Sequence, residues 1–125
     1  MERIEVDGAE LAVERRGDGP PLLFLNGSGA TLAATGMLRA PFEAAFEVVS
    51  FDARGIGQSS IPDVPFTMAD CAQDALAVMD HAGWDRCAVV GISFGGMVAL
   101  ELALRLPHKV RGLVLVNGFS EFMLE

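Results

Sequence analysis

The residues best suited to chemistry lie in the pentapeptide Gly91-Ile92-Ser93-Phe94-Gly95, which fits the pattern G-x-S-x-G. This pentapeptide follows a short apolar run, residues 87–90, and leads into a nearly all-apolar segment, residues 94–106. A serine on a sharp turn between a buried strand and a buried helix exposes its hydroxyl near the positive end of that helix. The pattern therefore predicts a nucleophile that attacks a carbonyl carbon. The alternative is a serine that only caps the helix of an ordinary α/β domain.

Glycine residues flank this serine at Gly91, Gly95 and Gly96. A Cβ atom at any of these positions is expected to crowd the turn or the helix that packs on it. The glycines therefore favour the interpretation in which the chain turns tightly around Ser93.

Four apolar runs are expected to form the strands that position this turn. They are residues 22–25, 46–51, 87–90 and 113–116. Continuous apolar runs are typical of strands that are buried on both faces of a parallel sheet. A sheet that ended at residues 113–116 would expose an unpaired hydrophobic edge, which natural proteins usually cover.

Two segments between or after these runs have the pattern of long helices. Residues 67–82 carry apolar side chains at a period of 3.6 residues, their first four residues resemble a capping box, and Gly83 suits the position after the last turn. Residues 94–106 are predicted to form a helix that stops at Pro107. Helices that alternate with apolar strands indicate an α/β fold with right-handed crossovers.

Two shorter features complete the expected secondary structure. Residues 3–6 and 10–15 alternate in character around Asp7-Gly8, which predicts an antiparallel hairpin. Residues 37–45 are predicted to form a short helix whose course Pro41 disturbs.

With these elements in place, the chain resembles the α/β-hydrolase superfamily over all 125 residues. Besides the serine turn, residues 25–29 stand where the family usually has a His-Gly-x-Gly loop, and residues 52–59 look like its D-x-R-G-x-G-x-S turn. Residues 107–115 are similar to its P-x-x-V-x-x-L-V-L approach to the sixth strand. The resemblance implies a mostly parallel sheet with an N-terminal antiparallel hairpin. It also implies that residues 1–125 are the N-terminal part of a single domain.

The resemblance also implies roles for individual residues. Ser93 would be the nucleophile, and the backbone N–H groups of Phe94 and Ser28 would form the oxyanion hole. The residues that would support these groups are Asn26, Gly27, Gly91 and Gly95. Because Asn26 replaces the family's usual histidine, the hydrogen bonds that shape its loop are expected to differ. Asp52 and Arg54 are interpreted as structural residues of a fixed turn.

The family's catalytic acid and histidine normally follow its seventh and eighth strands, and a lid lies between strands six and seven. We expect the chain to lack these C-terminal strands and the lid. His81 and His108 correspond to positions that the family places away from the carboxyl edge of the sheet, whereas Glu121 is a candidate acid because some members place it after strand six. We therefore expect a C-terminal half, as a second chain or the rest of a longer parent, or self-association through residues 113–116.

Three kinds of function remain open at this point. The first is a serine hydrolase that acts on an ester, a lactone or a similar small carbonyl compound. The second is carbon–carbon bond hydrolysis, perhydrolysis or acyl transfer on the same scaffold. The third is a non-catalytic ligand-binding or interaction module, which the absent base and Asn26 both favour.

The composition excludes several other classes. Hydrophobic residues make up 51% of the chain and its net charge is −8, which argues against disorder and against nucleic acid or an anionic membrane as partner. No apolar run approaches the roughly 20 residues of a spanning helix, and the N-terminal residues have no signal-peptide pattern, so a cytoplasmic protein is expected. Cys71 and Cys87 are interpreted as buried free thiols. No metal-ligand cluster is present in the sequence, so we predict neither a metal nor an organic cofactor, and a small molecule as substrate.

Overall fold

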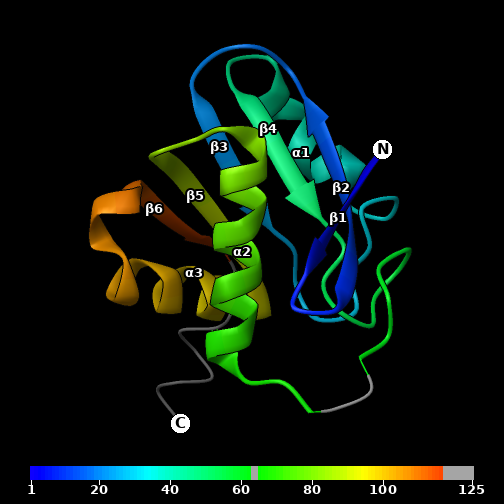
Figure 1. Ribbon diagram of the computed structural model, residues 1–125. Helices are drawn as coiled ribbons and strands as arrows, with labels where there is room; N and C mark the ends of the chain where they lie inside the picture. The colour runs from blue at the N-terminus through cyan, green and yellow to red at the C-terminus, as the bar shows by residue number, and fades with distance from the viewer. Residues whose placement is uncertain (63–64, 117–125) are drawn as a thin grey trace, which may run out of the picture.

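A computed structural model of the chain describes residues 1–62 and 65–116 (Figure 1). In this part of the chain six strands form one sheet in the order β1-β2-β4-β3-β5-β6. The strands are β1 (Glu2–Val6), β2 (Ala9–Arg16), β3 (Pro21–Leu25), β4 (Glu47–Phe51), β5 (Cys87–Ile92) and β6 (Val110–Val116). The helices are α1 (Gly36–Glu43), α2 (Met68–Ala82) and α3 (Phe94–Arg105), and a 3-10 turn, η1 (Pro107–Lys109), precedes β6.

The direction of the strands confirms the predicted fold class. Strands β3, β4, β5 and β6 pair in parallel, whereas β1 pairs with β2, and β2 with β4, in the antiparallel sense. The β1–β2 turn places Asp7 at φ 47° and Gly8 at φ 80°. Positive φ angles at both central residues are those of the tight turn that matches the twist of a hairpin. The expected N-terminal hairpin is therefore present.

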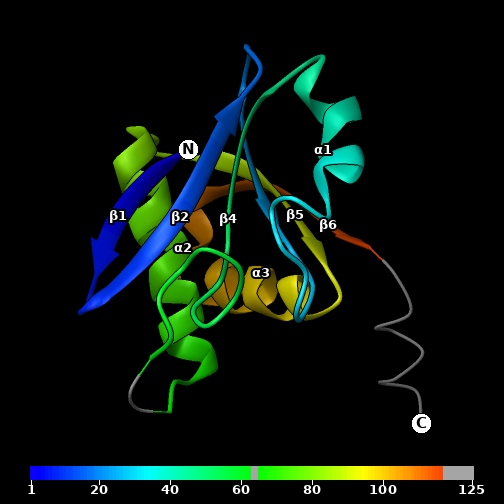
Figure 2. The same ribbon diagram turned by 90° about the vertical axis from the view of Figure 1, so that its right-hand side faces the viewer.

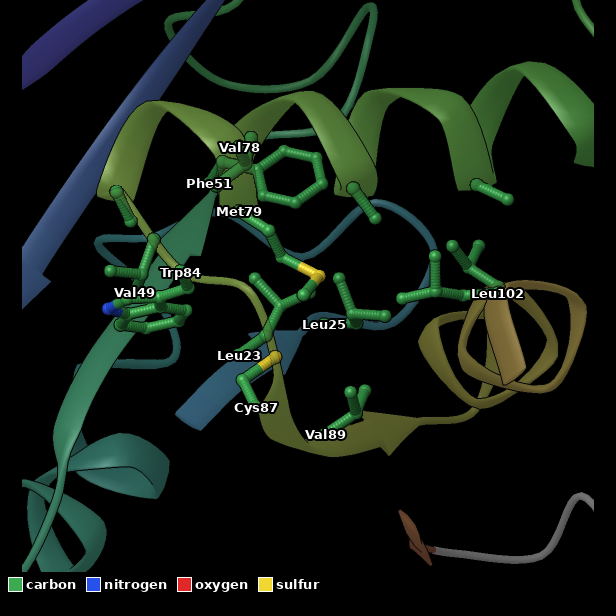
Figure 3. Packing of buried hydrophobic residues seen from close by; sticks show 14 of the residues in the cluster. Leu23, Leu25, Val49, Phe51, Val78, Met79, Trp84, Cys87, Val89 and Leu102 are labelled. Carbon is green, nitrogen blue, oxygen red and sulfur yellow. The ribbon is translucent and has the colours of Figure 1, made fainter. Parts of the chain in front are cut away.

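The sheet separates two hydrophobic clusters, one beside α2 and α3 and the other beside α1. The side view in Figure 2 shows these helices on the two sides of the sheet. Successive residues of a strand point to opposite faces, so Leu23 packs toward α2 and α3 while Phe24 packs toward α1. On the first face Leu23, Met79 and Leu102 meet in the larger core (Figure 3). On the second face the rings of Phe24 and Phe42 lie 6.0 Å apart. Both faces of the central strands are therefore buried, as continuous apolar runs predict.

Helix α2 begins and ends as its sequence indicates. The Asp70 N–H donates to Thr67 Oγ1 at 3.1 Å and the Thr67 N–H donates to Asp70 Oδ2 at 2.8 Å, which is a complete capping box. Gly83 ends the helix in the left-handed conformation with φ 80°.

None of the helices in residues 1–62 and 65–116 is long and apolar enough to cross a membrane.

Strand β6 differs from its prediction. The sequence indicates a strand buried on both faces at residues 113–116, but Val114, Leu115 and Val116 are 54%, 43% and 40% exposed. The prediction of burial is wrong because β6 is the last strand of the sheet and pairs only with β5 among the described residues. The exposed hydrophobic edge that the same run predicts is confirmed.

Candidate functional site

Ser93 lies where β5 turns into α3, at the carboxyl edge of the parallel strands. Its backbone has φ 54° and ψ −114°, a region that side-chain-bearing residues rarely occupy and that stores strain. Two contacts hold it there: the Ser93 N–H donates to Val116 O at 3.2 Å, and the Ser93 carbonyl accepts from the Gly96 N–H at 2.9 Å. The serine therefore sits on a sharp, strained turn between a strand and a helix.

The glycines around this turn are not equally necessary. A Cβ atom on Gly91 would lie 2.5 Å from the Gly95 oxygen, and a Cβ atom on Gly95 would lie 2.1 Å from the Leu25 oxygen. Both distances are too short, so the close approach of α3 to β3 and β5 requires glycine at these two positions. The expectation for Gly96 is wrong, because a Cβ there would make only ordinary contacts beginning at 3.5 Å.

We expect Gly95→Ala to lower the free energy of unfolding by about 3 kcal/mol, because the added methyl group must push α3 away from the carbonyl groups that end β3. Gly112→Ala is the matched control, since a Cβ there has no neighbour within 4 Å. Urea denaturation of the two variants measures the difference. Equal urea midpoints would show that the turn accommodates a side chain at Gly95.

The loop after β3, residues 26–29, lies directly beside Ser93. A Cβ atom on Gly27 would be 3.5 Å from the Ser93 Cβ and 3.4 Å from the Ile92 oxygen. Phe94 is the first residue of α3, so its N–H group has no partner within the helix. The N–H groups of Phe94 and Ser28 also have no partner among the described residues. The structure thus brings the predicted oxyanion loop and the serine turn together, while the roles of these N–H groups stay predictions.

Asn26 is held by a chain of hydrogen bonds to the segment that leads into α1. Its Oδ1 accepts from Thr35 Oγ1 at 2.9 Å, and Thr35 Oγ1 in turn accepts from Arg39 Nη1 at 2.7 Å. The second guanidinium nitrogen of Arg39, Nη2, donates to Leu32 O at 2.9 Å. The sequence did not reveal the role of Thr35 and Arg39 in holding Asn26. A turn separates these two residues from the loop after β3, and no local pattern links the two segments. The Asn26 Nδ2 is buried without a partner in the described part of the chain.

Asp52 holds the turn after β4, as its interpretation as a structural residue requires. The carboxylate is 2% exposed, and it accepts hydrogen bonds from the Leu32 N–H at 2.8 Å and the Gln58 N–H at 2.9 Å. Gly57 approaches so closely that a Cβ atom would lie 2.3 Å from Asp52 Oδ2, and its φ is 54°. Both carboxylate oxygens are therefore committed to the backbone of neighbouring loops.

Arg54 links the same turn to α2 through a bidentate ion pair. Its Nε and Nη2 donate to the two carboxylate oxygens of Asp74 at 2.6 and 2.8 Å, and the two side chains are only 11% and 3% exposed. The hydrogen bonds that Arg54 donates to Asp74 raise the pKa of Arg54 above its usual value. Sequence analysis missed Asp74. The feature that could have identified Asp74 is its position as an acidic residue among the apolar residues of α2.

A cavity of about 480 Å³ lies next to the serine turn. It is bounded by residues 25–30, by the start of α3, by the turn after β4, and by the N-terminal half of α2 with the residues just before it. The Cys71 thiol forms part of this wall and is half-buried, and burial raises its pKa, with a further contribution from the charges of Asp74 and Asp70. The volume falls within the usual range for small-molecule sites.

The histidines lie away from Ser93. His81 Nε2 is 2.9 Å from Glu2 Oε1, at the end of α2 that precedes β5, and His108 lies in η1 before β6. Ser93 lies at the carboxyl end of β5, whereas His81 precedes the amino end of β5 and His108 precedes the amino end of β6. Neither histidine therefore reaches Ser93 within the described structure. The candidate acid Glu121 lies outside the described residues. No group of three or more potential metal ligands occurs among residues 1–62 and 65–116.

Comparison with known proteins agrees with this architecture. A family profile described as "alpha/beta hydrolase fold" matches residues 20–125. A protein of Variovorax paradoxus that bears the name carbamate hydrolase RutD is 39% identical over 106 residues, which are 83% of this chain and 40% of that protein. The 3-oxoadipate enol-lactonase 2 of Acinetobacter baylyi is 31% identical over 100 residues, which are 80% of this chain and 38% of the enzyme. The chain spans about two-fifths of the length of these relatives.

Solved structures show the same likeness in three dimensions. Est816, described as an N-acyl homoserine lactone degrading enzyme, superposes with a TM-score of 0.86 and 31% sequence identity. The match covers 92% of this chain and 44% of Est816. The family profile, the relatives and the sheet order agree, and the chain belongs to the α/β hydrolase fold family.

Proposed function

We propose that the complete protein is a serine hydrolase that acts on an ester, a lactone or a similar small carbonyl compound, with Ser93 as its nucleophile. The observation that carries this proposal is the strained backbone of Ser93, φ 54°, on a turn beside a glycine-containing loop. Strain of this kind persists where the surrounding structure holds it, and it is concentrated at active sites. The names of the carbamate hydrolase, the enol-lactonase and the lactone-degrading enzyme all denote reactions at carbonyl groups.

In the proposed reaction the Ser93 Oγ attacks the carbonyl carbon of the substrate. The carbonyl oxygen gains negative charge, which the N–H groups of Ser28 and Phe94 stabilise. A histidine takes the proton from Ser93 and gives it to the leaving oxygen as the bond between that oxygen and the carbonyl carbon breaks, while a carboxylate orients the histidine. Water, which gives a proton to the same histidine, then attacks the acyl-enzyme; the bond to Ser93 Oγ breaks, the acid is released and the proton returns to Ser93. We assign the histidine to the part of the protein beyond this chain, and the acid either to that part or to Glu121.

Covalent labelling with a fluorophosphonate tests the proposed nucleophile. We expect the complete assembly to gain one label, on the peptide that contains Ser93, as measured by mass spectrometry. Ser28→Ala is the matched control, because it removes a hydroxyl at the same site but keeps the backbone N–H. Labelling that survives in Ser93→Ala, or that is absent from the native assembly, would contradict the proposal.

The second candidate is a non-catalytic binding module. Its supporting observation is that neither His81 nor His108 reaches Ser93 in the described structure. This candidate predicts that a fluorophosphonate does not label the protein and that the cavity still binds a ligand. Carbon–carbon bond hydrolysis, perhydrolysis and acyl transfer use the same nucleophile, so substrate profiling must separate them from ester hydrolysis after labelling has succeeded.

We further propose that this chain forms the N-terminal part of a single domain whose remaining strands pair with β6. The exposed side chains of Val114, Leu115 and Val116 support this, as does the two-fifths coverage of the relatives. An unpaired apolar edge is a template for another strand.

We also assign the protein to the cytoplasm, because Cys71 and Cys87 are both free thiols.

The native mass of the purified material, followed by the denatured mass of its components, tests this pairing. We expect either a second polypeptide of comparable size or one longer chain that contains these residues. A stable monomer of 13.2 kDa would contradict the proposal, as would a dimer built from two copies of this chain alone.

A further inference from the structure

The cavity beside Ser93 connects two different surroundings. The loop of residues 26–29 lines one part of its wall, together with Phe94 and Gly95. The N–H groups assigned to the carbonyl oxygen, those of Ser28 and Phe94, belong to this part. The first two turns of α2 line another part of the wall, through Met68 and Cys71. We therefore expect the substituent of a carbonyl group held by Ser28 and Phe94 to extend toward α2.

The wall of this cavity is largely apolar. Besides Met68, the aromatic and aliphatic residues that line it are Leu25, Phe51, Ile56, Phe66, Phe94 and Val98. They come from β3, β4, the loops on either side of residues 63–64, and α3. Apolar surface of this kind favours the binding of an alkyl group, which leaves water when it enters the cavity.

The charged groups in the wall neutralise one another. Arg54 and Asp74 both line the cavity, but the guanidinium donates through Nε and Nη2 to both oxygens of the carboxylate. Asp70 adds a further negative charge near Arg54. A bound carboxylate would have to compete with Asp74 for Arg54, so the cavity favours an uncharged group over an anionic one.

We propose that this cavity binds the apolar, uncharged acyl group of the substrate, and that Cys71 limits the length of the acyl group. The proposal rests on the proposed function of Ser93 and specifies its substrate class: esters or lactones with an alkyl chain on the carbonyl carbon that does not end in a charge. Cys71 is suited to this role because its small side chain belongs to the wall on α2, a different element from the loop and the turn that carry the assigned N–H groups.

Thiol alkylation tests whether the cavity binds such a group without relying on catalysis. Cys71 is half-buried at the cavity, whereas Cys87 is 0% exposed in the core, so Cys87 is an internal control. We expect N-ethylmaleimide to label Cys71 in the complete protein and hexanamide to slow that labelling at least fivefold, with acetamide and adipate having little effect. An unchanged labelling rate with hexanamide, or stronger protection by adipate, would overturn the proposal.

Kinetics test the link to the reaction. We expect Cys71→Phe to lower kcat/KM for p-nitrophenyl hexanoate about tenfold more than for p-nitrophenyl acetate, because the larger side chain removes space at the α2 wall, which the longer acyl chain needs more than the shorter one. Leu104→Phe is the matched control, because Leu104 is 79% exposed and does not line the cavity, and this variant is expected to keep the profile of the native protein. An equal loss on both esters, or a loss seen only when the alcohol part is lengthened, would overturn the assignment.

The two experiments separate this inference from the proposed function. If Ser93→Ala abolishes hydrolysis but Cys71→Phe leaves the chain-length profile unchanged, the nucleophile stands and the acyl site is wrong. If the native protein hydrolyses no ester but hexanamide still protects Cys71, the proposed function fails and the cavity remains a site for an apolar group.

Discussion

Replacement of Ser93 by alanine is expected to lower kcat for ester hydrolysis by roughly 10⁴-fold or more, with only the rate provided by binding and the oxyanion hole remaining. The reason is that no acyl-enzyme can form without the Ser93 hydroxyl, so water must attack the carbonyl directly. The measurement is the steady-state rate on p-nitrophenyl hexanoate, with the complete assembly of native and variant protein compared at equal concentration.

The stability of the same variant provides the control. The Ser93 side chain makes no hydrogen bond that caps α3, and alanine would occupy the same backbone conformation. We therefore expect the urea midpoint of Ser93→Ala to match that of the native protein. A loss of activity at native stability could then not be attributed to unfolding, whereas full activity in Ser93→Ala would reject Ser93 as the nucleophile.

Asp74→Ala is expected to cause the largest loss of stability among the single substitutions considered, roughly 3–5 kcal/mol. Asp74 and Arg54 are 3% and 11% exposed, and the substitution leaves the guanidinium buried without its carboxylate. Since this pair ties the turn after β4 to α2, its loss also loosens one wall of the cavity. Urea denaturation, followed by the fluorescence of Trp84, measures the change in the free energy of unfolding.

Asp85→Ala is the matched control for this experiment. Asp85 also pairs with a cation, Lys109 at 3.6 Å, but its side chain is 94% exposed. Exposed ion pairs contribute little, so we expect almost no change in its urea midpoint. A double variant, Arg54→Met with Asp74→Leu, should recover much of the loss because neither charge remains buried. A loss in Asp74→Ala no larger than in Asp85→Ala would show that solvent reaches Arg54 in solution.

Much of the secondary structure could be predicted because its signals are local. The capping box at Thr67 and Asp70 needs only residues three positions apart, and the Asp7-Gly8 turn needs only its own backbone angles. Strands β3, β4 and β5 are buried on both faces because α2 and α3 pack on one face and α1 packs on the other. The residues of β6 have the same composition, but their burial depends on a partner strand, and composition does not show whether that partner is present.

The contacts that cross the fold could not be predicted from local patterns. Arg54 and Asp74 lie 20 positions apart, and Asn26 and Thr35 lie 9 apart. Each pair meets because loops at one edge of the sheet converge, and many other polar residues could have met there instead. The difference between Gly95 and Gly96 has the same origin, since only Gly95 faces the carbonyl groups that end β3.

Amino-acid patterns alone predict the strand–turn–helix context of Ser93, the parallel sheet with its hairpin, and the resemblance to α/β hydrolases. These depend on periodicity and on spacing within short segments, which the chain order preserves. Three further features became visible in the folded molecule: the loop of residues 26–29 touches the serine turn, Arg54 is paired with Asp74, and an apolar cavity is lined by both Phe94 and Cys71. Such features depend on distances between segments far apart in the chain, and packing around a common core sets those distances.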